Sequence, residues 1–189
     1  MQKRLDFLFF LMVCALSVYA QKVTIQNGHF YSVYDVEIQC PLQVGWTVTP
    51  SDLGVARREP SWKFVQDVYH PSATGTHGDY KSSGYDRGHM CPALDRSANL
   101  QAMMSTFTMS NIAPQVPRLN RGAWKQTENF CRSAALLYDS VSVLALPVFL
   151  DRDTTFIGSH RLAVPHAFIK AAWLPKNDSI IALWWFWNR

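Results

Sequence analysis

The 189-residue sequence contains no internal repeat, no low-complexity tract and no Cys-x-x-Cys pair. The first two absences exclude a protein built from tandem repeats or a biased linker sequence. Because no cysteines are paired at ligand spacing, a structural zinc site is not expected. Regular alternation of strands and helices is also missing, which argues against a parallel βαβ sheet and favours an α+β domain.

Residues 1–20 have the features of a secretory signal peptide. Lys3 and Arg4 are followed by the apolar segment Leu8–Val18, and Ala20 is a small residue at the expected cleavage site. The apolar segment is too short to be a bilayer span. We therefore expect an exported protein, secreted or periplasmic, without stable membrane association after cleavage. Residues 21–189 are enough for one domain with a sizeable core.

The charge and the cysteine content of residues 21–189 say little about the function of the protein. They include 16 basic and 13 acidic residues. This mild excess is compatible with a polyanionic partner, but many secreted proteins are equally basic. Cys40, Cys91 and Cys131 form an odd number, so at least one thiol is unpaired within a monomer. The sequence defines neither the disulfide pairing nor the oligomeric state, and a homodimer is compatible with it.

The pattern of apolar residues predicts several strands and one principal helix. Val44, Trp46 and Val48 would share one face of a strand. The polar residues 50–84 would form a long connection, which in a compact domain is usually functional. Further strands are predicted at 106–111, 141–150, 162–164, 168–174 and 180–187.

The helix should begin near Pro117 and end near Tyr138. Its predicted apolar side consists of Trp124, Phe130, Ala134 and Leu137.

Gly84–Ala93 contains the densest group of chemically useful side chains. Asp86, Arg87 and His89 lie within four residues. Arginine is a fixed cation suited to phosphate oxygens, and histidine can accept a proton near neutral pH. Gly88 would allow a close backbone approach or a sharp bend. The segment predicts a site that binds a phosphate and activates a nucleophile. The alternative is that Asp86 and Arg87 form a surface ion pair and His89 merely packs against its neighbours.

Asn120, Trp124 and Glu128 are spaced i, i+4 and i+8, so they would form one stripe on the helix. Amide and carboxylate oxygens suit a hard cation such as Mg²⁺, and the tryptophan could pack beneath the site. The alternative is an amphipathic helix with solvated polar residues. The same choice, between a solvated face and a phosphate-tracking surface, applies to the basic residues Arg118, Arg121, Lys125 and Arg132.

Four ordered blocks, Gly84–Met90, Ser110–Gln115, Leu119–Trp124 and Glu128, resemble the DNA/RNA non-specific endonucleases. These are the sugar-non-specific ββα-metal nucleases, which include mitochondrial endonuclease G. The resemblance implies an α+β fold with a mixed or antiparallel sheet and a ββα-metal core. It also implies a phosphodiesterase that cuts DNA and RNA using Mg²⁺, with Mn²⁺ or another divalent cation as a substitute.

The resemblance implies a role for each matching residue. His89 would be the general base, and Asn120 the one direct protein ligand of the metal. Arg87 would be a phosphate or transition-state cation, Glu128 would hold metal-bound water, and Asn111 would be an amide that organises the site. The residues expected to bind nucleic acid are Arg58 (with Arg57 as the alternative), Arg87, Arg121 and Lys125.

Relatives usually continue past the position of Arg189, so we expect a shortened C-terminus. Ile180–Trp187 is predicted to be a buried strand, covered by the domain or by a second chain. If it is not covered, it should make the isolated protein poorly soluble. Deletion of residues 180–189 should then change solubility or oligomeric state much more than the geometry around His89 and Asn120. Two other interpretations remain open: a catalytically inactive nucleic-acid-binding relative, and a truncated fragment without function.

Overall fold

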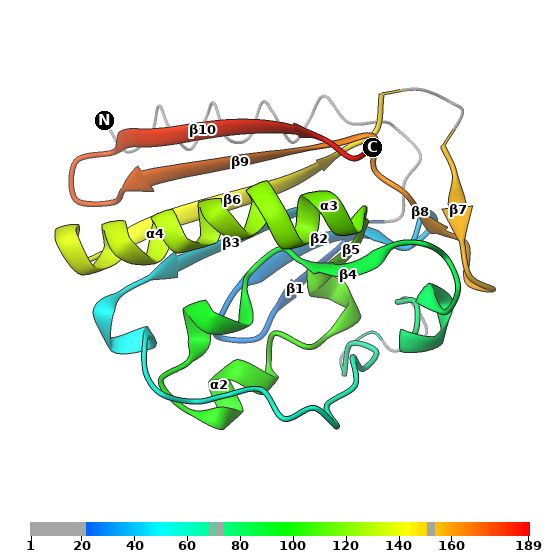
Figure 1. Ribbon diagram of the computed structural model, residues 1–189, viewed down its shortest axis with the longest axis horizontal. Coiled ribbons are helices and arrows are strands. Elements are labelled where there is room, and N and C mark those ends of the chain that lie inside the picture. Colours follow the sequence, from blue (N-terminus) through cyan, green and yellow to red (C-terminus); the bar gives the residue numbers. More distant parts are fainter. Residues whose placement is uncertain (1–21, 69, 71–73, 151–153) are drawn as a thin grey trace.

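The computed structural model describes residues 22–68, 70, 74–150 and 154–189, so the expected signal peptide at 1–20 lies outside the described residues. A six-stranded antiparallel sheet forms the centre of the molecule, in the order β1-β2-β3-β6-β9-β10 (Figure 1). The α+β class is confirmed. The six strands are Lys22–Gln26, Tyr31–Asp35, Cys40–Val48, Val141–Val148, Ala167–Leu174 and Ser179–Trp187.

Two smaller strand pairs and several short helices complete the fold. Strands β4 and β5 form one pair, and β7 and β8 form the other; their bounds are Asp86–His89, Ile112–Gln115, Phe156–Ile157 and Leu162–Ala163. Helix α2 and the 3-10 helices η1, η3, η4 and η5 lie in the connections, at Leu100–Met104, Pro50–Asp52, His77–Tyr80, Ala93–Arg96 and Met109–Asn111.

The principal helix covers one face of the sheet (Figure 1). It consists of α3 (Pro117–Leu119), the π-helical segment η6 (Asn120–Trp124) and α4 (Lys125–Tyr138). Pro117 at the first helical position is pre-organised for a helix start, and Asp139, with φ of 67°, ends the helix in the left-handed region. The predicted helix is confirmed.

The apolar side predicted for the helix is only partly correct. Trp124 and Ala134 are buried, but Phe130 and Leu137 are 42% and 71% exposed. The residues buried in α4 are Thr127, Cys131, Ala134 and Ala135. These positions follow the 3.6-residue period from Trp124, whereas Phe130 and Leu137 do not. Position along the helix, rather than side-chain size, decides which residues enter the core.

The strand that contains Val44, Trp46 and Val48 is confirmed, since all three side chains are buried in the core between the sheet and the helix. The strand predicted at 106–111 is wrong. There the chain makes a single bridge at Thr108 and then the 3-10 helix η5, and strand β5 begins only at Ile112.

Strand β10 lies at the edge of the sheet, so the expectation that it is buried is also wrong. Its side chains alternate: Trp184 and Phe186 pack on the core, whereas Leu183, Trp185 and Trp187 are 69%, 45% and 46% exposed.

Three buried cysteines, Cys40, Cys91 and Cys131, are free thiols. Within the described ranges, no helix has the length and apolar character needed to cross a membrane.

Candidate active site

Two antiparallel strands and the helix that follows them bring the predicted site residues together. Strand β4 ends at His89 and pairs with β5 in a register that places His89 opposite Ile112 and Gly88 opposite Ala113. Any Cβ at Gly88 would overlap the side-chain amide of Gln115, which explains the need for glycine here. After β5, Val116 caps the helix that carries Asn120 and Glu128.

A pocket of about 540 Å³ lies where these elements meet, and both imidazole and carboxylate groups line it. Its apolar wall includes Phe64 and Phe107. Five cationic side chains also line it, so the pocket suits an anionic ligand such as a phosphodiester. These cations are Arg58, Arg87, Arg121, Lys125 and Arg132.

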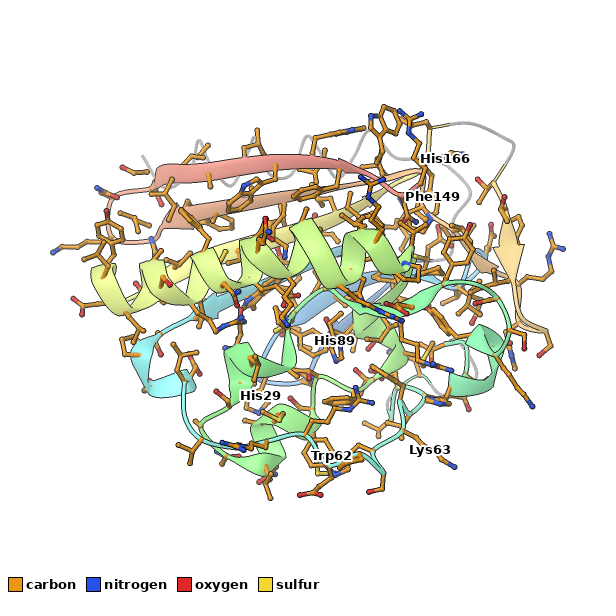
Figure 2. The ribbon with its side chains drawn as sticks, in the orientation of Figure 1. His29, Trp62, Lys63, His89, Phe149 and His166 are labelled. Carbon is orange, nitrogen blue, oxygen red and sulfur yellow. The ribbon has the colours of Figure 1, made fainter. Side chains whose placement is uncertain are left out.

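His89 is held between aromatic rings at the pocket wall. Its ring centroid lies 5.1 Å from that of Phe64 and 4.9 Å from that of Phe107. Figure 2 shows His89 on the side of the helix away from β9 and β10. The indole N–H of Trp124 donates to the His89 carbonyl at 3.0 Å, which fixes the end of β4 against the helix.

The imidazole of His89 is neutral at physiological pH. Burial, aided by the positive charge of Arg58, lowers the pKa of His89 from 6.5 to about 3. Its Nε2 is shielded from solvent and has no hydrogen-bond partner in the described structure. A neutral imidazole can accept a proton, and because Nε2 is enclosed the proton would go to the other ring nitrogen, Nδ1.

Asn120 is oriented by a carboxylate rather than left free in the pocket. Its Nδ2 donates to Oδ2 of Asp86 at 2.9 Å. Arg121 binds the same carboxylate through two hydrogen bonds, at 2.8 and 2.6 Å. These bonds, that of Arg121 first, lower the pKa of Asp86, which therefore remains ionised. Because the amide nitrogen is engaged, the Oδ1 oxygen of Asn120 is the atom available to a cation.

Glu128 lines the pocket and accepts no hydrogen bond from the described residues. Burial raises the pKa of Glu128, and the charge of Lys170 opposes this effect more than any other neighbour. Within the described residues, no group of three or more His, Cys, Asp or Glu side chains could hold a metal. The donors Asn120 and Glu128 are oxygens, so they fit a hard cation that keeps most of its water, as Mg²⁺ does.

Arg87 and Arg58 both line the pocket, but they differ in the contacts that hold their side chains. Arg87 donates from Nε and Nη2 to the carbonyl of His77, at 3.3 and 2.6 Å, and stacks over Tyr80. Arg58 lies over the ring of Phe107, 4.9 Å from its centroid. Of the two upstream arginines considered from the sequence, Arg58 lines the pocket and Arg57 does not.

Asn111 lies behind the site rather than in it. It is completely buried, accepts a hydrogen bond from Cys91 N at 2.8 Å and donates to the carbonyls of Cys91 and Thr106. It therefore fixes the backbone immediately after His89 and acts as a positioning residue. Arg118 is exposed and does not line the pocket.

Two residues in and beneath the pocket, Asp86 and Lys170, were not assigned a role from the sequence. Asp86 lies within the motif at Gly84–Ala93. Its hydrogen bond to Asn120 joins positions 34 residues apart, so it could be recognised only once the fold was known. Lys170 interrupts the apolar strand Ala167–Leu174, and that interruption is itself the signal that could have identified it.

Comparisons with known proteins identify the family of the chain. The family model described as DNA/RNA non-specific endonuclease matches residues 13–186. Mitochondrial endonuclease G of Homo sapiens is 38% identical over 136 residues, covering 67% of this chain and 46% of that protein. The mitochondrial nuclease of Saccharomyces cerevisiae is 38% identical over 155 residues, covering 75% of this chain and 47% of that protein.

A solved structure of the EndoG/EndoGI complex, whose title concerns the mechanism of EndoG inhibition, is similar in fold. The TM-score is 0.78 at 28% identity, and the match covers 88% of this chain and 74% of that one. The chain spans about half the length of the curated relatives it matches. Because the family model matches nearly all of the sequence, the chain belongs to the DNA/RNA non-specific endonuclease family.

Proposed function

We propose that the protein is a Mg²⁺-dependent endonuclease that hydrolyses phosphodiester bonds of DNA and RNA with little sequence preference. One observation carries this proposal: the neutral imidazole of His89, the oriented amide of Asn120 and the carboxylate of Glu128 face one cationic pocket. A pocket that engages phosphates gains affinity without reading bases, which accounts for low specificity. The signal features of residues 1–20 support action outside the cytoplasm.

In the proposed reaction His89 is the general base. Since its Nε2 is enclosed, Nδ1 is the nitrogen that would take a proton from a water molecule in the pocket. The water oxygen forms a bond to phosphorus as the bond to the 3′-oxygen breaks, and the leaving oxygen is protonated from solvent. General-base catalysis of this kind typically contributes about 10²–10⁴-fold.

Asn120 would bind the cation through Oδ1, and Glu128 would hold its water. When bound, Mg²⁺ would supply Lewis-acid stabilisation of the leaving and phosphoryl oxygens. A neutral amide ligand leaves the positive charge of the ion nearly undiminished. Arg87, held rigidly by the carbonyl of His77, would stabilise charge on the phosphoryl group, and Arg58, Arg121 and Lys125 would bind the backbone of the substrate.

Digestion of supercoiled plasmid and of RNA by the purified protein, with Mg²⁺ and with EDTA, tests this function. We expect cleavage of both substrates with Mg²⁺, loss of that activity in EDTA, and a severe loss of the Mg²⁺-supported activity in Asn120→Ala. Full activity in EDTA would contradict the metal assignment. Binding of nucleic acid without cleavage at any Mg²⁺ concentration would instead show an inactive relative.

A further inference from the structure

The hairpin formed by β7 and β8 lies at one end of the molecule, and none of its residues lines the active-site pocket (Figure 1). Its turn nevertheless approaches the 3-10 helix η3 closely. A Cβ at Gly158, in this turn, would overlap Asp79 of η3, and a Cβ at Gly75, just before η3, would overlap the side chain of Leu162. Glycine at both positions allows the hairpin to pack directly against the segment that contains η3.

Asp79 joins the hairpin to η3 through both oxygens of its carboxylate. Oδ2 accepts from N and Oγ1 of Thr76, at 2.7 and 2.8 Å, which closes η3 as a capping box. The same oxygen accepts from Nδ1 of His160 at 2.9 Å. Oδ1 accepts from N of His160 at 3.1 Å and from Oγ of Ser159 at 3.2 Å. Only 5% of Asp79 is exposed, so solvent competes little for these bonds.

η3 in turn holds Arg87 from two sides. The carbonyl of His77 accepts from Nε and Nη2 of Arg87, and the guanidinium carbon lies 5.2 Å from the ring centroid of Tyr80. Tyr80 is buried in the same apolar cluster as Ile157 and Leu162 of the hairpin. Because these contacts engage Nε and Nη2, Nη1 is the nitrogen left for a phosphate oxygen in the pocket.

The position of the His77 carbonyl depends on what fixes the turn. A single 3-10 turn has poor hydrogen-bond geometry and little stability of its own. Phe64 donates from its backbone N to Nδ1 of His77 at 3.3 Å and stacks on that ring, which holds the side chain of His77. Asp79 instead closes the backbone of the turn from which the carbonyl projects, and the hairpin holds Asp79.

We propose that Asp79 is a positioning residue for Arg87: by binding Ser159 and His160, it lets the β7–β8 hairpin fix η3 and, with it, the carbonyl and the ring that hold the guanidinium. The importance for cleavage rests on the proposed function, but the effect on Arg87 does not. A cation that is already oriented stabilises a transition state without reorganising as the reaction proceeds. Loss of the contacts of Asp79 should therefore release Arg87 without removing any group that touches the substrate.

The arginine Nε–H signals in ¹⁵N NMR spectra measure how firmly Arg87 is held, without an activity assay. Arg87→Lys identifies the signal by its loss. In His160→Ala, which leaves the capping box of η3 intact, this N–H should exchange with water about tenfold faster than in the wild type, as expected for the loss of one hydrogen bond to a charged group. His160→Asn keeps a donor near the position of Nδ1 and should restore slow exchange. Exchange as slow in His160→Ala as in the wild type would overturn the proposal.

Two further variants separate this role from a general loosening of the hairpin. Arg161→Gln is the matched control, since Arg161 is exposed in the same hairpin and lies over the ring of Phe156, 4.4 Å from its centroid. It should leave the exchange of the Arg87 N–H unchanged, and equally fast exchange in this control would overturn the role of Asp79. Asp79→Asn replaces one accepting oxygen by an amide and should release Arg87 at least as much as His160→Ala. If Asp79→Asn does not fold, the two His160 variants decide the question.

A double-mutant cycle tests whether the hairpin acts on catalysis through Arg87. His160→Ala should lower kcat for plasmid cleavage about tenfold, a size typical of coupled positions, with KM little changed. In the Arg87→Ala background the same substitution should have almost no further effect, because the group that it positions is gone. Equal losses in both backgrounds would show a structural role only and would overturn the proposal. If the wild-type protein cuts nothing, the proposed function fails while the exchange measurement still decides the placement of Arg87.

Discussion

The side-chain amide of Asn120 donates to the carboxylate of Asp86 at 2.9 Å, which fixes the direction of its Oδ1 oxygen. This bond joins the first residue of β4 to the start of the helix. The same strand carries His89 at its other end. One short strand therefore positions both the proposed base, His89, and the proposed metal ligand, Asn120. The geometry of the site therefore depends on Asp86, which in the proposed mechanism neither binds the metal nor removes a proton.

Replacement of Asp86 by alanine should lower the Mg²⁺-dependent rate by about 10–100-fold, because outer partners of metal ligands typically have effects of that size. Asp86→Asn keeps an oxygen that can accept from Asn120 and should retain most of the activity. The measurement is the rate of plasmid cleavage as a function of Mg²⁺ concentration. Arg121→Ala is the control: it removes the ion pair but not the Asn120 bond, so it should mainly raise KM. An Asp86→Ala variant with a normal Mg²⁺ response would contradict this role.

His89→Ala should reduce cleavage by about 10²–10⁴-fold while leaving DNA affinity largely intact, because the imidazole acts on water rather than on the substrate. Cleavage rates and fluorescence anisotropy of labelled DNA separate the two quantities. His29→Ala is the matched control, since His29 lies outside the site pocket. Near-normal cleavage by the His89 variant would remove this residue from the mechanism.

The low pKa of His89 also predicts a loss of stability in acid. Its pKa is about 3 in the folded protein and 6.5 in the unfolded chain. Between these values the unfolded chain binds more protons, so the free energy of unfolding falls as the pH falls from 6.5 towards 3. This contribution has a slope of at most about 1.4 kcal/mol per pH unit. In urea unfolding at pH 7, 5 and 4, His89→Gln should lose stability less steeply than the wild type; parallel curves would contradict the assignment.

The elements that the sequence predicted well are those whose signals are local. The motif at Gly84–Ala93 and the helix from Pro117 could be placed because glycine, proline and helical spacing act over a few residues. The resemblance of four ordered blocks then joined these segments into one site, and the structure brings Arg87, His89 and Asn120 to the same pocket.

The parts that were missed depend on contacts between distant segments. Thr106–Asn111 has a composition suited to a strand, but Asn111 uses its side chain to bind the backbone of Cys91 and Thr106, and the chain turns there instead. Strand β10 is as apolar as a central strand, so its place at the edge could not be read from its composition. The burial of Lys170 against Trp124 could not be predicted without knowing which face of β9 meets the helix.

Asn188 is hydrogen-bonded to the segment that leads into the candidate active site, so deletion of residues 180–189 should disturb that segment as well as solubility. Asn188 accepts a hydrogen bond from Val116 N at 2.8 Å and donates to the carbonyls of Pro114 and Pro165, at 2.9 and 2.8 Å. Val116 caps the helix, and its carbonyl in turn accepts from Asn120 N at 3.0 Å. Asn188, which directly follows β10, thus anchors the segment that leads from β5 into the turn that carries Asn120.

Asn188→Ala should therefore reduce both stability and activity. The variant loses three hydrogen bonds and leaves the buried carbonyls of Pro114 and Pro165, and the partly buried N–H of Val116, without this partner, so we expect a loss of about 2–4 kcal/mol in the free energy of unfolding. Urea unfolding measures the loss, and the Mg²⁺ dependence of cleavage shows whether the helix start has moved. Asn177→Ala, in the exposed turn between β9 and β10, is the matched control and should change neither quantity by a comparable amount. If the two variants were equally stable and equally active, the C-terminal anchor would have no part in shaping the site.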